Sequence, residues 1–455
     1  MAGFISRNMG LIPAALLYII VNLAFFSNSM YWDSAVYLSM GKHIWSSGGI
    51  GLWEPARPVL WPVFLGFLWK LGLDAVLIGK LVSMAMGLLA VASVYFILKD
   101  TAKGSAVIFT ALFALSGAVA ENSSLLTVDI PSMALSLFAI CLIIRKGMNF
   151  VPGIIIGLSA MTKFTHLIFI PILMAAIFLR RNQLKDSFLF FLGSFSALMP
   201  YLAINVFQHG NAFYSFIEGS RLISDVAAAY HSNAGNIFYI NGIFFEFPLL
   251  ALALIPLFSL RNWKHCLLAI ALIVPLAYHS FFLDYKDMRY STIFLPYLFI
   301  LGGIGYAHLS RWKIKKVLVA FVIAQAAYSS YSLYSLHSSH YFGGSLGLEK
   351  QIALIPEKLD IWSTNPYASA LRDIRTTELM YYPVFNSEKM EYLYSKLDSI
   401  PDYVVVSACD IPCDNRDMEC QEKSETFLSG FSQRLSIISE NTENGCKTTI
   451  YSKNS

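Results

Sequence analysis

Long apolar runs separated by short polar turns fill the chain up to about residue 337. A helix needs about 20 mostly apolar residues to cross the hydrocarbon core of a bilayer. Runs of this kind cover residues 10–28, 74–98, 105–120, 129–144, 187–207, 237–259, 266–283, 291–309 and 316–334. The pattern therefore predicts an all-α polytopic membrane domain.

One longer apolar stretch, residues 151–179, is interrupted by the polar sequence of residues 162–166. We expect two short helices that meet at this break and return to the same side of the membrane. With this pair the chain has about eleven membrane helices.

Lys and Arg side chains orient the helices, because basic loops stay on the cytoplasmic side. With a cytoplasmic N-terminus and a returning pair at 151–179, every tight basic cluster falls on the inner face. These clusters are Lys99 and Lys103; Arg145 and Lys146; Arg180, Arg181 and Lys185; Arg261 and Lys264; and Arg311, Lys313, Lys315 and Lys316. The first run is expected to stay as an anchor. The prediction is a multi-pass protein of the cell membrane.

Three longer segments, 29–73, 208–236 and 337–455, then lie on the outer face. The first has apolar residues at helical spacing and predicts two helices in the membrane surface. The last is rich in charged residues and contains strand-like runs such as 403–407, which predicts a soluble α/β domain. The predicted domains are therefore 1–336 and 337–455.

Four cysteines fall in the last segment, and an oxidising outer face favours one or two disulfides among them over a zinc site. They are Cys409, Cys413, Cys420 and Cys446. Cys141 and Cys266 lie in or beside spans and are expected to be packing residues.

Composition supports the membrane prediction. Hydrophobic residues make up 56% of the chain and charged residues only 14%, where a soluble domain has about 25% charged residues. The net charge of +4 says little alone, because the placement of Lys and Arg matters more than their sum in a membrane protein. No basic stripe or nucleic-acid-binding motif is present. Nucleic acid is therefore not an expected partner.

Asp33 follows the first apolar run directly, on the predicted outer face. A carboxylate there could act as a general base toward a hydroxyl or amine. Asp before a helical pattern is also typical of a helix N-cap, and the two roles are compatible. Glu121 and Asp129 bracket the next outer loop. Asp129 precedes Pro131 by two residues and opens a helix, which favours a cap.

Several cations are expected on the same face. Lys163 and His166 lie at the break in the returning pair, where a lysine is costly unless it reaches the interface or pairs with an anion. Lys286 and Arg289 come just before the tenth span, beside Tyr290. Such a pair suits a phosphate or diphosphate, and an ion-pair network within the loop is the alternative.

Two further sets are weaker candidates. Arg57 lies between the predicted surface helices, next to prolines that can simply start a helix. The predicted outer segment 208–236 carries polar residues that exposure to solvent explains equally well. They are Arg221, Asp225, Tyr230 and His231.

These motifs, in this order, resemble those of the GT-C membrane glycosyltransferases, in particular the protein O-mannosyltransferase and aminoarabinose transferase branch. Residues 33–37, with Asp33 and Tyr37, are similar to the family's Asp-Glu-x-x-Tyr, and residues 57–62 to its Lys/Arg-Pro-Pro-Leu. The other matches are 127–131 to the acidic start of the fourth span, 157–163 to Gly-Leu-Ala-x-Leu-Thr-Lys, and 286–290 to Lys-Glu/Asp-x-Arg-Tyr/Phe. Ser34 replaces the second acid and Val59 the second proline; Ser34 weakens any metal site built from adjacent carboxylates.

The resemblance implies an enzyme that moves a sugar, with inversion, from a polyprenyl-phosphate donor to a protein, glycan or lipid acceptor on the outer face. It implies that Asp33 is the base and that Lys163 and Arg289 neutralise the leaving phosphate, with Lys286 and His166 as second choices. Asp129 and Glu121 would hold sugar or acceptor hydroxyls. Tyr37, Arg57 and Tyr290 complete the substrate-binding set.

This chemistry needs one base and no protein acid, because phosphate is already a good leaving group. Asp33, Asp129, Lys163 and Arg289 are expected to line one cavity. No cofactor is required by these residues, although a divalent metal is compatible with them. A transporter or flippase of lipid-linked sugars is the main alternative, but transporters more often show internal repeats with sites at the midplane. A non-catalytic assembly protein is the third.

Overall fold

The computed structural model describes most of the chain. The described residues are 8–24, 26, 30–147, 149–181, 184–229, 234–258, 262–283, 285–310, 315–339, 346–380, 387–407, 418–443 and 446–453. They form two compact units, each of which gathers segments that are far apart in the sequence. The first unit contains residues 1–27, 80–213 and 234–340, and the second contains 28–79, 214–233 and 341–455. The boundaries 1–336 and 337–455 stay predictions about domains that fold independently.

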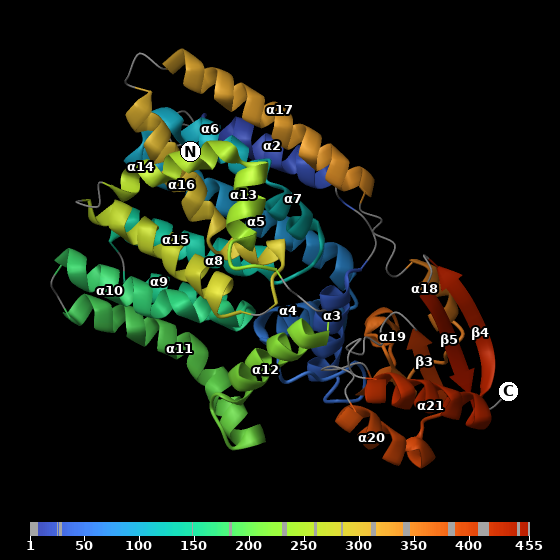
Figure 1. Ribbon diagram of the computed structural model, residues 1–455. Helices are drawn as coiled ribbons and strands as arrows, with labels where there is room; N and C mark the ends of the chain where they lie inside the picture. Colours follow the sequence, from blue (N-terminus) through green and yellow to red (C-terminus); the bar gives the residue numbers. More distant parts are fainter. Residues whose placement is uncertain are drawn as a thin grey trace. The chain divides into compact units, whose positions relative to one another are not determined.

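The described part of the first unit is helical (Figure 1). Its helices are α2 (Leu11–Ala24), α5 (Ala75–Thr101, from Lys80 on), α6 (Ala106–Ala114), α7 (Gly117–Ser124), α8 (Asp129–Lys146), α9 (Phe150–Thr162), α10 (Phe169–Arg181), α11 (Leu184–His209), α13 (Phe238–Glu246), α14 (Leu254–Leu257), α15 (Trp263–Phe281), α16 (Leu295–Leu309) and α17 (Lys315–Ser339). Short 3-10 segments join several of them, including η2 (Phe164–Ile168) and η4 (Met288–Ile293).

Three described helices, α5, α11 and α15, are long and apolar enough to cross a membrane. Two bent pairs raise the number to five. In one pair, α6 and α7 meet at 53°, and in the other, α13 and the segment 248–257 meet at 114°. The predicted spans 105–120 and 237–259 are therefore both broken. Other apolar helices have 10–17 residues, so the count of about eleven is not reached by this measure and stays a prediction.

The return predicted within 151–179 is present. Helix α9 ends at Thr162, and Lys163 is extended, with φ −150° and ψ 118°. Helices α9 and α11 run in the same direction, since Gly153 lies against Phe190 and Gly157 against Ser194. Helix α10 runs back, because its end lies at the end of α8: Arg180 Nη1 donates to the Ile143 carbonyl at 3.3 Å. Both ends of the pair therefore lie at the C-terminal end of α8.

Both ends of helix α8 carry residues that stabilise a helix terminus. Asp129 is in its first turn and Arg145 and Lys146 are in its last, which matches the charges to the helix dipole. Gly147 closes it in the left-handed conformation, with φ 64°. Helix α16 is buried on every side from Leu295 to Tyr306, as expected of a helix with no polar face.

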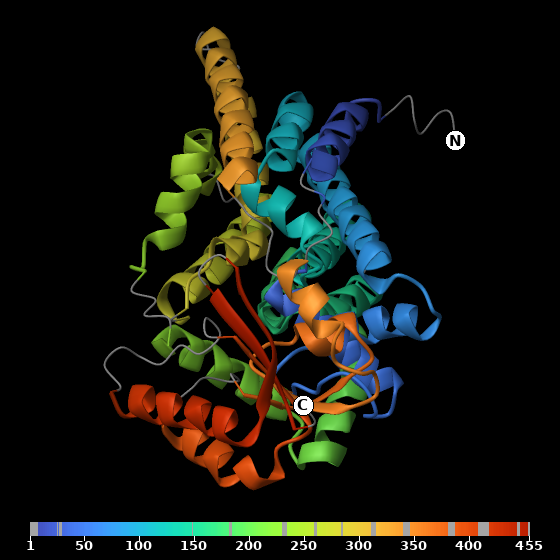
Figure 2. The ribbon, with the colours of Figure 1, turned by 90° about the vertical axis from the view of Figure 1, so that its right-hand side faces the viewer.

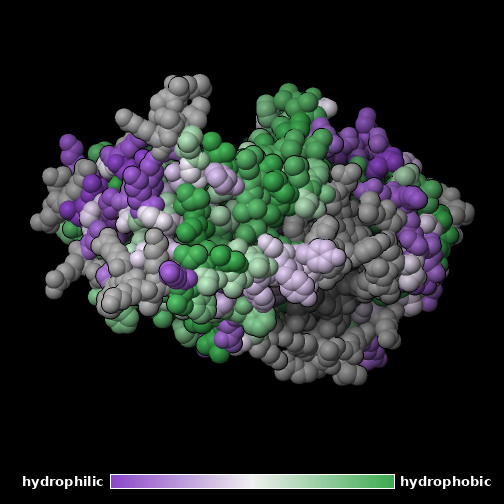
Figure 3. Space-filling model, turned by 90° about the horizontal axis from the view of Figure 1, so that it is seen from above, coloured by the Kyte–Doolittle hydropathy of each residue, from purple (hydrophilic) through white to green (hydrophobic). Residues whose placement is uncertain are grey.

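Large hydrophobic side chains also cover much of the surface. Phe207, Phe245 and Phe258 are 89%, 79% and 91% exposed. In the face drawn in Figure 3, hydrophobic residues gather in a broad area. Apolar surface of this extent is stable against lipid and costly in water.

The second unit contains a five-stranded mixed sheet of order β2-β1-β3-β5-β4. Its strands are β1 (Asp360–Ser363), β2 (Arg375–Leu379), β3 (Tyr403–Ser407), β4 (Ser436–Glu443) and β5 (Cys446–Ser452), so the strand predicted at 403–407 is correct. β1 pairs in parallel with β2 and β3, and β5 pairs antiparallel with β3 and β4. Helices α20 (Ser387–Ser395) and α21 (Met418–Arg434) pack on one face through residues such as Leu393, Phe427 and Phe431 (Figure 2).

The two helices predicted in the first outer loop are α3 (Trp32–Trp45) and α4 (Leu60–Lys70). Their backbones touch at Gly41 and Gly66, where an added Cβ on Gly66 would lie 2.2 Å from the Gly41 carbonyl oxygen. Trp45 Nε1 donates to the Val63 carbonyl at 2.9 Å and fixes the pair further. The remaining helices of this unit are α12 (Tyr214–Ala229), α18 (Leu346–Ile352) and α19 (Tyr367–Leu371).

Of the four C-terminal cysteines, Cys420 is disulfide-bonded. Cys409 and Cys413 and the side chain of Cys446 lie outside the described residues. Cys141 and Cys266 are free, as expected of packing residues.

Candidate active site

Asp33 belongs to a group of three charged side chains in the second unit. Arg57 Nη1 donates to Asp33 Oδ1 at 2.7 Å, and Arg57 Nε donates to Glu54 Oε1 at 2.6 Å. The side chains of Asp33 and Arg57 are 12% and 13% exposed, and that of Glu54 is 3% exposed. One guanidinium therefore bridges two carboxylates at a site that is largely closed to solvent.

The geometry of α3 explains why Asp33 faces this arginine. The N-cap is Tyr31, which makes no side-chain capping bond, so Asp33 lies inside the first turn and is not the cap. Tyr37, one turn later, presents its ring to the Arg57 guanidinium at 5.3 Å, and its hydroxyl accepts from Arg57 Nη1 at 3.4 Å. Asp33, Tyr37 and Arg57 thus lie together.

A second group lies in the first unit, where Lys163 and Asp129 form a buried ion pair with Nζ–Oδ1 at 2.5 Å. Residue Asp129 is 2% exposed and Lys163 8%. The cap expected for Asp129 is not present, because Val128 holds the N-cap position and Asp129 is the first residue of α8. The extended backbone at Lys163 ends α9 and directs the lysine to the start of α8.

Lys163 also faces the ring of Tyr290, with Nζ 4.6 Å from its centroid. The guanidinium carbon of Arg289 lies 5.3 Å from the centroid of the same ring. Arg289 pairs with Asp287 through Nε and Oδ2 at 3.1 Å, while Asp287 Oδ1 caps η4 by accepting from the Arg289 backbone N–H at 2.9 Å. Two predicted phosphate ligands therefore converge on one aromatic ring, and each already has a carboxylate partner.

Other predicted residues lie as follows. Lys286 Nζ donates to the Ala234 carbonyl at 3.0 Å, which holds the start of the segment before α13. His166 is completely buried in η2, and among the described residues neither of its ring nitrogens has a hydrogen-bond partner. Glu121 lies in α7 and is half-buried.

The weaker candidates of segment 208–236 do not gather at a site in the described residues. Arg221 pairs with Glu218 on the surface of α12 at 2.7 Å. Tyr230, His231 and the side chain of Asp225 lie outside the described residues.

Solved structures resemble the whole chain. ArnT from Cupriavidus metallidurans bound to undecaprenyl phosphate superposes with a TM-score of 0.69 at 13% identity, over 99% of this chain and 98% of that one. AglB, the archaeal oligosaccharyltransferase from Archaeoglobus fulgidus, in complex with an inhibitory peptide and a dolichol-phosphate, gives 0.59 at 14% identity, over 88% and 69%. An Archaeoglobus fulgidus oligosaccharyltransferase tethered with an acceptor peptide gives 0.61 at 13% identity, over 99% and 74%. This chain has the GT-C fold.

At these identities the likeness is one of fold. No protein-family model matches the sequence, and no curated protein matches it significantly. The fold predicted from the order of the motifs is confirmed. The comparisons therefore assign no role to an individual side chain.

Two acidic residues of these groups, Glu54 and Asp287, are not among the predicted site residues. Glu54 lies in a short segment between α3 and α4, and only its position three residues before Arg57 connects it to the motif. Asp287 lies within the 286–290 motif, where the sequence pointed to the cations on either side of it. Both are revealed by the arginine that each contacts.

Among the described residues, no group of three His, Cys, Asp or Glu side chains is arranged to hold a metal ion. The Arg57 guanidinium contacts both Asp33 and Glu54 in the second unit.

Proposed function

We propose that this protein is a membrane glycosyltransferase that transfers a sugar from a polyprenyl-phosphate donor to an acceptor on the extracytoplasmic face, with Asp33 as general base. The observation that carries the proposal is the convergence of Lys163 and Arg289 on the ring of Tyr290. In a GT-C fold built from apolar helices, such a cluster is costly unless it has a function. A phosphate linked to a lipid is the kind of anion that can reach cations placed among apolar helices.

The phosphate is assigned to the group around Tyr290. Asp129 and Asp287 hold Lys163 and Arg289 in place before a ligand binds. The developing negative charge on the leaving phosphate is then stabilised by cations that need no further reorganisation. Arg289 can offer a planar pair of N–H donors to phosphate oxygens, whereas Lys163 acts as a point charge.

The proton is assigned to Asp33. The acceptor oxygen or nitrogen attacks the anomeric carbon as the bond from that carbon to the phosphate oxygen breaks, and Asp33 takes the acceptor proton. The products are the glycosylated acceptor and the polyprenyl phosphate, with inversion at the anomeric carbon. Arg57 holds the carboxylate of Asp33 by an ion pair, and Glu54 holds Arg57 from its other side.

The test is an in-vitro assay with purified protein and a radiolabelled polyprenyl-phosphate sugar, with release of polyprenyl phosphate measured alongside transfer. Asp33→Asn is expected to lower transfer by at least about 100-fold, the lower range for loss of a general base. Asp74→Asn is the matched control, because Asp74 is an exposed carboxylate that only caps the start of α5.

Full transfer by Asp33→Asn would contradict the mechanism. Movement of intact labelled donor across a vesicle membrane, without release of polyprenyl phosphate, would support the flippase alternative instead.

A further inference from the structure

Helix α3 packs against the C-terminal segment of the chain and contacts it at several points. Within the second unit, its residues contact the loop after β1, helix α19 and the loop between α19 and β2. These contacts connect residues more than 300 positions apart in the sequence. None of the motifs in the sequence accounts for them.

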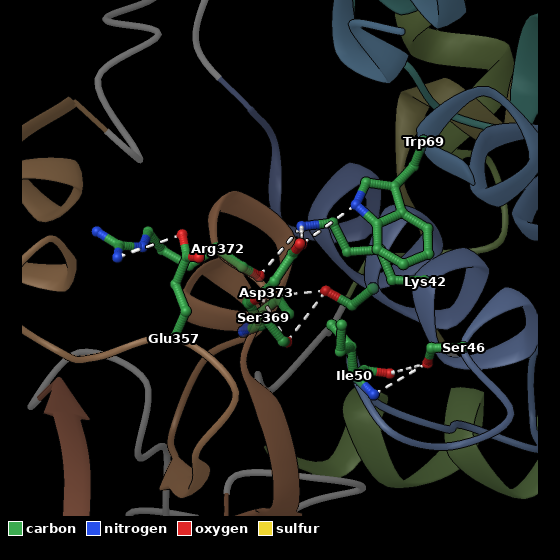
Figure 4. Close-up of polar contacts among 10 residues, drawn as sticks. Lys42, Ser46, Ile50, Trp69, Glu357, Ser369, Arg372 and Asp373 are labelled. Atoms are coloured by element: carbon green, nitrogen blue, oxygen red, sulfur yellow. Dashed lines mark hydrogen bonds and ion pairs between the residues drawn. The ribbon is translucent and has the colours of Figure 1, made fainter. Parts of the chain in front are cut away.

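The central contact is a buried lysine at the far end of α3 (Figure 4). Lys42 is 4% exposed, and its Nζ donates to the Arg372 carbonyl at 3.1 Å and to Asp373 Oδ1 at 3.2 Å. The same carboxylate oxygen accepts from Trp69 Nε1 of α4 at 3.1 Å. Burial lowers the pKa of Lys42, and the charge of Asp373 opposes that effect. Asp373 therefore joins α3 and α4 at one point.

Two further contacts secure the same helix. Ser39 Oγ donates to the Pro366 carbonyl at 3.3 Å and accepts from Ser369 Oγ at 3.1 Å, with both serines fully buried. Gly51, which follows α3, forms a parallel bridge with Arg375: its N–H donates to the Ile374 carbonyl, and its carbonyl accepts from the Thr376 N–H, each at 2.9 Å. Its φ of +85° and the Ser39 carbonyl beside it exclude a side chain at this position.

The location of α3 on the sheet is also informative. In an open sheet with parallel strands, ligands bind beyond the carboxyl ends of the strands where the strand order reverses. β1 is such a point, because its parallel neighbours β2 and β3 lie on opposite sides of it. The loop after β1 contacts Ser39, and Tyr367 meets the ring of Trp32, the residue before Asp33, edge-on at 6.2 Å. Helix α3 therefore occupies the edge where a ligand of the sheet would bind.

We propose that Lys42, Trp69 and Asp373 are positioning residues, through which the C-terminal segment holds α3 and so fixes Asp33 against Arg57. This inference rests on the proposed function of Asp33. Nine residues of one α-helix, a rise of about 13 Å, separate Asp33 from Lys42. A helix of this length moves as a rigid body, so release of its far end displaces the carboxylate. A displacement of about 1 Å at a reacting group can cost about 100-fold in rate.

The experiment compares full-length Lys42→Met and Asp373→Asn with wild type. Asp360→Asn is the matched control, since it removes an ion pair with Arg375 in the same region whose two side chains are more than 40% exposed. Three quantities are measured: kcat, the KM for a polyprenyl-phosphate sugar, and amide hydrogen exchange of residues 32–45 by mass spectrometry.

Both test variants are expected to lower kcat by about tenfold or more with the KM for the donor changed less than about twofold. Exchange of residues 32–45 is expected to rise, while that of residues 129–146 stays at its wild-type rate. Asp360→Asn is expected to match wild type in all three quantities.

Wild-type kcat in both variants would overturn the inference, whether or not exchange of α3 rises, because a contact that is only structural changes exchange alone. A fall in kcat with unchanged exchange of α3 would also overturn it. An inactive wild-type protein would instead contradict the proposed function, and the exchange data would still report whether Lys42 holds α3.

Discussion

The two charged groups of this molecule differ in how their charges balance. Around Arg57, one cation contacts two carboxylates, Asp33 and Glu54. Around Tyr290, each cation has its own carboxylate and both face one ring. We infer that two carboxylates on one cation suit the uptake of a proton, whereas two cations on one ring suit the binding of an anion. In the proposed function, the same residue types therefore serve different chemistry because they are paired differently.

The largest effect is expected at the buried pair of the first unit. Lys163→Met leaves the carboxylate of Asp129, which is 2% exposed as a residue, without its partner, and breaking a buried pair costs about 3–5 kcal/mol. We expect a large fall in the thermal unfolding temperature in detergent and loss of binding to polyprenyl phosphate.

The double variant Lys163→Met/Asp129→Asn separates the two effects. Removal of both charges should restore most of the stability, because no buried charge is left unpaired. Binding of polyprenyl phosphate should stay lost. Recovery of binding together with stability would show that Lys163 is only a structural partner of Asp129.

An intermediate effect is expected at Arg57. Arg57→Lys keeps the charge but cannot hold Asp33 and Glu54 with two separate N–H groups. The loss of one charge-assisted hydrogen bond, about 2 kcal/mol, corresponds to roughly 30-fold in kcat. The KM for the donor should change little. A large rise in that KM would show that Arg57 binds the phosphate of the donor and does not position Asp33.

A smaller effect is expected at the ring that Lys163 and Arg289 share. Tyr290→Leu removes both cation–π contacts, worth about 1 kcal/mol, and should weaken binding of polyprenyl phosphate by roughly fivefold. Tyr290→Phe keeps the ring and serves as the control. Equal loss in the two variants would assign the effect to the hydroxyl.

The smallest effect concerns pH. Burial, and then the charge of Arg375, lowers the pKa of His43 from its ordinary value of 6.5. Below pH 6.5 the unfolded chain therefore binds more protons at this residue than the folded chain does, and the free energy of unfolding falls as the pH falls. His43→Gln should flatten that dependence slightly in unfolding experiments between pH 7 and pH 5. An unchanged slope would show that His43 titrates normally.

Much of the fold could be predicted from local patterns. The break at Lys163, the helices of the first outer loop and the strand 403–407 each depend on a few neighbouring residues. The bends within 105–120 and 237–259 could not, because hydropathy measures length and composition but not the path of a helix.

The residues of the candidate site were likewise predictable only where a local pattern in the sequence marks them. Asp33, Arg57, Lys163 and Arg289 were found because each breaks an apolar pattern or belongs to a motif. Lys42 and Asp373 were missed because they contact each other across more than 300 positions of the sequence. Glu54 contacts Arg57 three residues later, but it lies outside the 57–62 motif. The cap favoured for Asp129 and the cap considered for Asp33 are absent, because both residues lie inside the first turn of a helix, where they pair with Lys163 and Arg57.

The most direct test is a side-by-side measurement of donor binding and single-turnover transfer in Asp33→Asn and Lys163→Met. A radiolabelled polyprenyl-phosphate sugar is bound to excess purified protein, acceptor is added, and the transferred label is followed in time. We predict that Asp33→Asn binds the donor like wild type but transfers at least about 100-fold more slowly, whereas Lys163→Met fails to bind it. Loss of donor binding in Asp33→Asn, with normal binding in Lys163→Met, would contradict the assignment of proton and phosphate to these two groups.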